Sequence, residues 1–395
     1  MSQERRKELI SQIEEKRGSR VLTYVTGDRP PAQAAIGDDA VRPLYDHLRG
    51  IGRADRLDVF IYSRGGAIDV PWCLATSFRQ SSEEWSILVP FRANSSATLL
   101  ALGADKIVLG RQGELGPIDP SMTLSRVVGD PAQNQGTVVQ DTVSVEDVMA
   151  YVKFVTDRAG LSDQAALATS LTKLTERLDP VALGSAYRTH SHIRDVARRM
   201  LLSRKDPASE QTMASIIETL AERVYAHGHA IGLQEAKETG LPVEGADDDL
   251  DRLMWELLNE YEEDLKLREP LDVLAALSAG DRYVEQVTLA TIESTWGTHS
   301  FTGTLEVQAK RQLPPTLNVA LNLNLQLPPG LDVAQVPAEI QNLLAGLQQA
   351  VMQQAQLAVQ VAIQQQAPLL GAEARVKGGM WQADTTSPEG GVAGH

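Results

Sequence analysis

Two short segments in the first third of the chain constrain its fold most strongly. The run LDVFIY, residues 57–62, is short and rich in β-branched and aromatic residues, which is typical of a buried parallel strand, and it is followed by Gly65 and Gly66. The run SILVP, residues 86–90, predicts a second buried strand, and after it come Ser95 and an apolar helix. Together these segments predict an α/β fold that carries half of an acyl-transfer site.

The residue types at the two strand ends fit that chemistry. Glycine adopts backbone conformations that are closed to other residues, so the amides of Gly65 and Gly66 can face a ligand, as an oxyanion hole requires. Ser95 allows two interpretations. Taken alone, a serine at a helix start is more often an N-cap; the alternative is a nucleophile whose oxyanion is held by the Ser96 amide and the glycine pair. The order of the motifs favours the nucleophile.

That order resembles the Clp protease/crotonase superfamily, in the form used by signal peptide peptidase A. The phrases ADKIVLG at 104–110 and ELGPIDP at 114–120 are most similar to the serine dehydrogenase proteinase family, and HGHAIGLQEAKETGL at 227–241 resembles the segment that closes the site in these folds. The resemblance covers about residues 20–243. It implies that Ser95 is the nucleophile and that Gly66, with Gly65, supplies oxyanion donors.

The chain departs from these relatives at two places. Arg64 stands where the related peptidases usually have proline, so we expect a less rigid loop. Where Clp proteases place their histidine base, this chain has Ile118, Asp119 and Pro120, so we do not expect a triad of the Clp kind. Asp119 is either a turn residue, the commoner role, or a group that orients a base or binds a substrate amine.

The resemblance implies a lysine base, which must be desolvated to accept a proton. Lys173 is the first candidate, because it precedes DPVALG at 179–184, which resembles a stretch of the proteinase family near its catalytic dyad; Lys153 is the second. A lysine on an amphipathic helix is usually solvated, so each assignment competes with a structural role. His227 and His229 are further candidates for the base, although a histidine beside glycine is more often a local hydrogen-bonding group.

Composition limits the other function classes. A net charge of −15 argues against nucleic-acid binding. The single cysteine, Cys73, excludes an internal disulfide, and we expect it in the core. His190 and His192 are two residues apart and point to different sides of a helix, so we expect no metal, and no cofactor is required. No window reaches the ~20 apolar residues of a membrane span, and the polar first segment is unlike a signal peptide, which predicts a cytoplasmic protein.

The C-terminal third differs in pattern from the first. Residues 247–263 predict an acidic amphipathic helix, and the alternating runs 301–310 and 317–327 predict a β-hairpin. Residues 338–367 form a Gln- and Ala-rich helix whose one charged residue is Glu339, so we expect it to pack against symmetry mates. The residues after Lys377 are predicted to be disordered.

The sequence therefore predicts a Clp protease/crotonase-like α/β domain with a twisted, mostly parallel sheet and flanking helices, a C-terminal β-hairpin and a long Gln/Ala-rich helix. The expected division is an N-terminal helix at 1–17, the peptidase domain at 18–245, an oligomerisation region at 246–367 and a tail at 368–395. The expected function is a homo-oligomeric serine endopeptidase that acts on peptides or unfolded proteins. Two alternatives are an acyl-CoA-transforming enzyme of the crotonase type, with no role for Ser95, and a catalytically silent scaffold.

Overall fold

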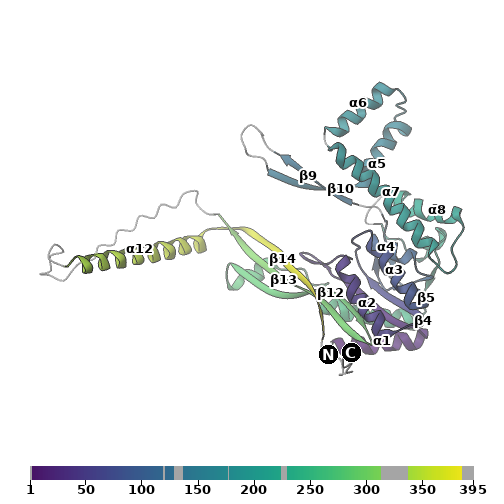
Figure 1. Ribbon diagram of the computed structural model, residues 1–395, viewed down its shortest axis with the longest axis horizontal. Helices are drawn as coiled ribbons and strands as arrows, with labels where there is room; N and C mark the ends of the chain where they lie inside the picture. Colours follow the sequence, from purple (N-terminus) through teal and green to yellow (C-terminus); the bar gives the residue numbers. More distant parts are fainter. Residues whose placement is uncertain are drawn as a thin grey trace, which may run out of the picture. The chain divides into compact units, whose positions relative to one another are not determined.

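The computed structural model describes residues 2–118, 121–128, 137–176, 178–223, 229–312 and 337–384, which fall into two compact units (Figure 1). The first unit comprises Met1–Pro270, Val287–Gly303 and Gly378–His395; the second comprises Leu271–Gln286 and Thr304–Lys377. The division differs from the expected boundary at 245/246. The acidic helix α10 (Asp248–Asp264) belongs to the first unit because its apolar side is buried there with α1 (Ser2–Arg17).

The first unit is built on the parallel part of an eight-stranded sheet with the order β11-β7-β5-β4-β1-β12-β13-β14. The five strands at one side of this order are mutually parallel: β11 (Val243–Gly245), β7 (Lys106–Leu109), β5 (Ser82–Val89), β4 (Ala54–Tyr62) and β1 (Arg20–Thr26). β12 (Arg282–Ser294) joins β1 antiparallel, followed by β13 (Gly297–Arg311) and β14 (Leu369–Ala383). The predicted fold class, a mostly parallel α/β sheet with flanking helices, is confirmed.

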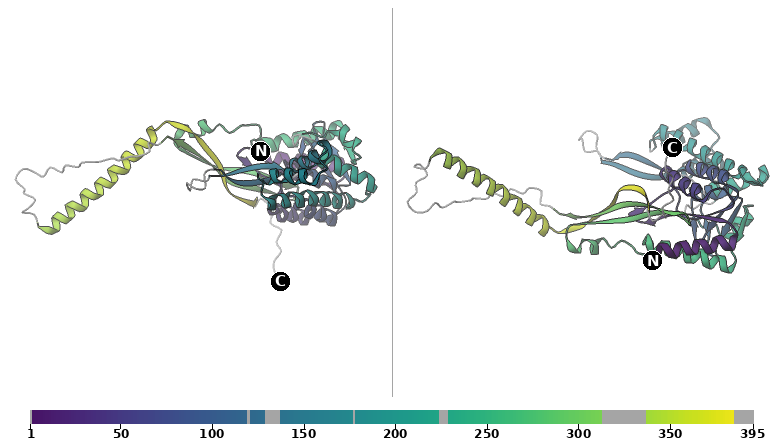
Figure 2. Two further views of the ribbon diagram at one scale, coloured as in Figure 1. Left: turned by 90° about the horizontal axis from the view of Figure 1, so that it is seen from above. Right: turned by 60° about the horizontal axis from the view of Figure 1, so that its bottom comes forward.

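Both faces of the parallel strands are buried, and their side chains alternate between two apolar clusters, as the period-two geometry of a strand requires. On β4, Val59 and Ile61 face the cluster with α3 (Val70–Ser81) and α4 (Ser96–Leu102), whereas Phe60 and Tyr62 face the cluster with α1 and α10. Figure 2 shows α1, in purple, beside the green α10. The sheet is therefore covered on both sides by helices.

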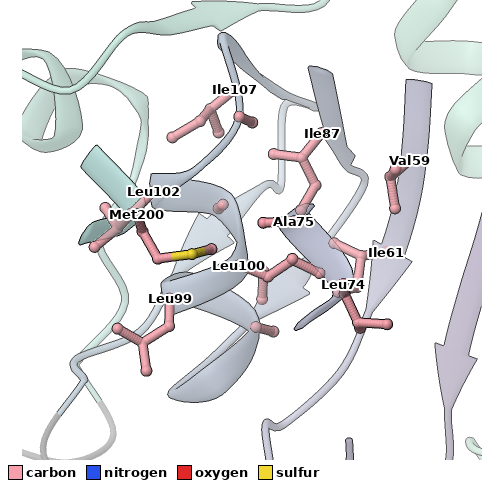
Figure 3. Packing of buried hydrophobic residues seen from close by; sticks show 14 of the residues in the cluster. Val59, Ile61, Leu74, Ala75, Ile87, Leu99, Leu100, Leu102, Ile107 and Met200 are labelled. Atoms are coloured by element: carbon pink, nitrogen blue, oxygen red, sulfur yellow. The ribbon is translucent and has the colours of Figure 1, made fainter. Parts of the chain in front are cut away.

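The larger cluster continues beyond α3 and α4. Figure 3 shows Met200 lying against Leu99 and Leu102 of α4, on the side opposite Ile87 of β5. The other helices of the first unit are α2 (Val41–Ile51), α5 (Val145–Lys153), α6 (Gln164–Thr175), α7 (Pro180–Leu202), α8 (Glu210–Glu218) and α9 (Leu233–Glu238), with short 3₁₀ or π turns at Asp38–Ala40, Phe154–Arg158 and Thr219–Arg223.

Four two-residue strands and one hairpin complete this unit. They are β2 (Asp28–Arg29) with β3 (Ala32–Gln33), β6 (Arg92–Ala93) with β8 (Glu114–Leu115), and the antiparallel pair β9 (Ser121–Val128) and β10 (Thr137–Ser144).

The second unit holds α11 (Val273–Ala276), the 3₁₀ turn Leu277–Ala279, parts of β12, β13 and β14, and the Gln-rich helix α12 (Ala338–Gln366). The alternating run 301–310 lies in β13. Its expected hairpin partner, 317–327, lies outside the described residues.

Two expectations are wrong. The predicted disordered tail contains β14, because Trp381 packs against Tyr24 and Phe301 and its Nε1 donates to Asp39, 2.9 Å away; no local pattern reveals such distant partners. Cys73 is exposed instead of buried, since Leu74 and Ala75 take the inward positions of α3.

Among the described residues no helix is both long and apolar enough to cross a membrane.

Candidate functional site

The two predicted motifs lie side by side at the carboxyl ends of β4 and β5. These strands are parallel neighbours, so the segments that leave them emerge at the same edge of the sheet. There Ser63 bridges Ala93 of β6: the Ser63 amide donates to the Arg92 carbonyl, and the Asn94 amide donates to the Ser63 carbonyl, both at 3.0 Å. The glycine pair and Ser95 follow this bridge directly.

Ser95 occupies the turn between β6 and α4 with φ 53° and ψ −117°. A positive φ is disfavoured for residues with a Cβ, and such strain persists only where the surroundings impose it, often at functional sites. Ser95 stands at the N-cap position, yet its hydroxyl makes no capping hydrogen bond. Its half-buried side chain therefore lies on a sharp strand-to-helix turn, and its hydroxyl does not cap the helix.

Thr98 and Gly116 hold this turn in place. The buried Thr98 Oγ1 lies 2.6 Å from the Ala93 carbonyl oxygen and 2.8 Å from that of Gly116, and it accepts a hydrogen bond of 3.1 Å from the Gly116 amide. A Cβ at Gly116 would lie 2.9 Å from the Cβ of Asn94. The chain after β8 can therefore approach the Ser95 turn only because residue 116 is glycine.

The glycine pair is fitted between Ser95 and Ile36. A Cβ at Gly65, whose φ is +106°, would lie 2.7 Å from the Ser95 Cβ. A Cβ at Gly66 would lie 2.2 Å from the Ile36 carbonyl oxygen, and the Ile36 amide donates to the Gly65 carbonyl at 2.8 Å. Both positions admit only glycine without a shift of backbone.

The three predicted oxyanion donors are not equivalent. The Gly65 amide donates to Ser63 Oγ at 3.1 Å, and the same oxygen accepts a hydrogen bond from Thr26 Oγ1 at 2.8 Å. In the parts of the chain that the structure describes, no acceptor pairs with the amides of Gly66 and Ser96. These two N–H groups are the ones left to bind an anion.

Arg64 is tied to the loop's surroundings. Its Nε donates to Asp28 Oδ2 at 2.8 Å, and the Tyr62 hydroxyl donates to the same oxygen at 3.0 Å. Burial, with the nearby Asp28 carboxylate, raises the pKa of the Tyr62 phenol, so it remains a donor. An ion pair thus restrains the loop in the place where the related peptidases have proline.

The predicted bases lie at exposed positions, as His229 does before α9, or outside the described part. Lys173 lies on α6, none of whose side chains is buried, and its Nζ lies 2.8 and 2.9 Å from the Glu176 carboxylate oxygens. Lys153 ends α5 and is exposed. Lys173 is therefore solvent-exposed and ion-paired, which is not the buried setting that a lysine base requires. Asp119 and His227 lie outside the described residues.

Sequence reasoning overlooked the supporting residues Ser63, Thr98 and Ile36. Ser63 directly follows the strand that leads to the glycines. A serine between that strand and the glycine pair was the feature of the sequence that could have indicated its role. Thr98 and Ile36 gave none, because their roles depend on contacts across the fold.

Comparison with known proteins agrees with the sequence resemblance. Residues 1–128 match the family model of the ClpP-like SDH-type serine proteinases, so the resemblance to serine dehydrogenase proteinases is confirmed over that part of the chain. The matched part contains Ser95 and both glycines.

Two proteins of Methanocaldococcus jannaschii are also similar to this chain. The uncharacterized protein MJ0137 is 24% identical over 281 residues, which is 68% of this chain and 82% of that protein. The uncharacterized protein MJ1495 is 28% identical over 125 residues, 29% of this chain and 41% of that protein.

Proposed function

We propose that this chain is a serine peptidase of the ClpP-like SDH type and that Ser95 is its nucleophile. The observation that carries the proposal is the strained Ser95 turn, with an uncapped hydroxyl beside Gly65. A nucleophile must be accessible and aimed at a bound carbonyl, which a sharp strand-to-helix turn achieves.

In the proposed reaction, Ser95 Oγ bonds to the peptide carbonyl carbon while a base takes the hydroxyl proton. The amides of Gly66 and Ser96 hold the oxyanion, the base returns the proton to the departing amine, and water then hydrolyses the acyl-enzyme. Lys173, Lys153, His227 and His229 remain predictions for the base, and Asp119 a prediction for its support. Peptides or unfolded proteins are the proposed substrates of a cytoplasmic homo-oligomer.

The test is labelling of purified protein with a fluorophosphonate probe, followed by intact-mass and peptide mapping. We expect one adduct, on Ser95, in the wild type and none in Ser95→Ala. Ser77→Ala is the matched control: its hydroxyl donates to the Cys73 carbonyl of its own helix, so that variant should label like the wild type.

If the wild type reacts with the probe, unlabelled wild-type protein and Ser95→Ala would then be assayed on a fluorogenic unfolded substrate such as reduced, dye-labelled casein. Absence of an adduct on the wild type would contradict the proposal and favour the scaffold or the acyl-CoA alternative. Binding of a coenzyme-A thioester that Ser95→Ala leaves unchanged would select the second of these.

A further inference from the structure

A histidine–carboxylate pair joins two helices of the first unit. His192 lies on α7, and its Nε2 is 2.6 Å from Oδ1 of Asp69, the residue immediately before α3. The two residues are 123 positions apart in the chain. Asp69 follows Gly66 by three positions, so the pair is attached to the loop that carries the proposed oxyanion donor.

The packing of three helices shows at which edge of the sheet the pair lies. At one end of α4, a Cβ on Gly103 would be 2.8 Å from Met200 Cε and 3.4 Å from Ala75 Cβ, so α3, α4 and α7 meet there. In the chain, α3 lies between β4 and β5, and α4 lies between β5 and β7; because these strands are parallel, the two helices run in the same direction.

The His192–Asp69 contact fixes the direction of α7 as well. Asp69 lies six residues before Ala75 of α3, and His192 lies eight residues before Met200 of α7. At the start of α4, Ser95 lies eight residues before Gly103. At 1.5 Å per residue these are displacements of about 9 to 12 Å along the helix axes. Ser95, Asp69 and His192 therefore lie at the same end of three neighbouring helices.

We propose that His192, oriented by Asp69, is the general base for Ser95, which rests on the serine peptidase function proposed above. With the Nε2 proton donated to the Asp69 carboxylate, Nδ1 carries the lone pair and takes the Ser95 proton as Oγ bonds to the carbonyl carbon. The same Nδ1 then gives that proton to the amine as the peptide C–N bond breaks.

This arrangement avoids the difficulty that Lys173 presents. A histidine base does not need the burial that a lysine base requires. The side chain of His192 is 44% exposed, which leaves the ring accessible to a substrate.

His229 also pairs with a carboxylate. His229 Nε2 lies 3.0 Å from Glu235 Oε1, and its side chain is also 44% exposed. The two residues stand on either side of Ile231, whose backbone bridges Leu115. His229 is also a candidate base from the sequence, so it is the alternative from which the experiment must distinguish His192.

The test is the rate at which the fluorophosphonate probe labels Ser95 in the full chain. We expect His192→Ala to slow labelling by at least about 100-fold and Asp69→Asn by a smaller factor, with the control Ser77→Ala within about twofold of the wild type. Added imidazole should restore part of the rate to His192→Ala and none to Ser95→Ala, an outcome that a purely structural histidine would not give. Thermal unfolding of each variant checks that it is folded.

Three results would overturn the inference. Labelling of His192→Ala at the wild-type rate would exclude His192 as the base, but it would leave Ser95 as the nucleophile and the peptidase proposal intact. Loss of labelling in Lys173→Ala or His229→Ala, but not in His192→Ala, would assign the base elsewhere. A wild type that is never labelled would remove the peptidase function and the proposed base together.

Discussion

The helices α4 and α12 are both rich in apolar residues but lie in opposite environments. All seven residues of α4 are buried, whereas in α12 of the second unit Leu343, Leu347, Val351 and Leu357 are 47 to 67% exposed. A seven-residue helix is unstable by itself, so its conformation comes from the side chains around it. The comparison teaches that the short helix behind Ser95 is held by tertiary packing, whereas these four side chains of α12 bury little of their surface within the single chain.

The largest effect is expected at the loop that meets the start of α4. Gly66→Ala would place a Cβ 2.2 Å from the Ile36 carbonyl oxygen and 2.5 Å from the Ile36 nitrogen, neither of which can rotate away. We expect a loss of about 3 kcal/mol or more in the free energy of unfolding, measured by urea denaturation, and loss of probe labelling. Gly184→Ala is the control, because nothing lies within 4 Å of its added Cβ, and it should be neutral or stabilising.

Within α4 itself, Leu100→Ala should lower the free energy of unfolding by about 2–5 kcal/mol, since its side chain is 0% exposed and its removal leaves a cavity. Urea denaturation followed by circular dichroism measures the change. A loss below about 1 kcal/mol would show that the neighbouring side chains close around the smaller residue. Packing would then contribute less to the stability of α4 than its burial implies, and the contrast with α12 would weaken.

A buried histidine should make the stability of the first unit depend on pH. His47 is 0% exposed, with Nδ1 2.7 Å from Ser294 Oγ and Nε2 3.0 Å from His299 Nδ1. Burial foremost, with His299 and Lys7, lowers the pKa of His47 to about 3. Because the unfolded chain takes up this proton near pH 6.5 and the folded chain does not, the stabilisation is complete above that pH and declines as the pH falls.

We expect the free energy of unfolding to fall by about 2 kcal/mol between pH 7 and pH 5 through this group. Urea midpoints at pH 7, 6 and 5 would be compared for the wild type and His47→Gln. A slope that is the same in both proteins would show that His47 is not the group responsible.

The smallest effect is expected on α12. Leu347→Ala removes a side chain that is 53% exposed, so the free energy of unfolding should change by less than about 0.5 kcal/mol. The measurement should be repeated over a hundredfold range of protein concentration. A large loss that grows with concentration would mean that assembly buries this helix, and the comparison with α4 would then hold only for the single chain.

The features of the fold that the sequence predicted are local ones. The runs 57–62 and 86–90 lie in β4 and β5 because short, continuous apolar segments are stable only when both faces of a sheet are covered. The pairing of β12 with β1, and of Trp381 with Tyr24, joins segments more than 250 residues apart, and no local periodicity encodes such a pairing.

The candidate site divides in the same way. Ser95 and the glycine pair could be found because a strand, a small-residue turn and a helix follow one another in the chain. The hydrogen bond from the Gly65 amide to Ser63 Oγ depends on the backbone angles of the loop, which the amino-acid composition does not reveal. The environment of Lys173 and the partner of His192 depend on how α6 and α7 pack, so the base could not be deduced from spacing.

The backbone angles of Ser95 also bear on what selection has retained at this position. Glycine would adopt φ 53° without steric penalty, so a chain selected only for durability would have glycine there. Ser95→Gly should therefore melt at a higher temperature than Ser95→Ala, which keeps the Cβ. If so, catalytic reactivity and thermal stability place opposite demands on residue 95. In descendants of this protein that no longer need the activity, we would expect glycine to replace the serine.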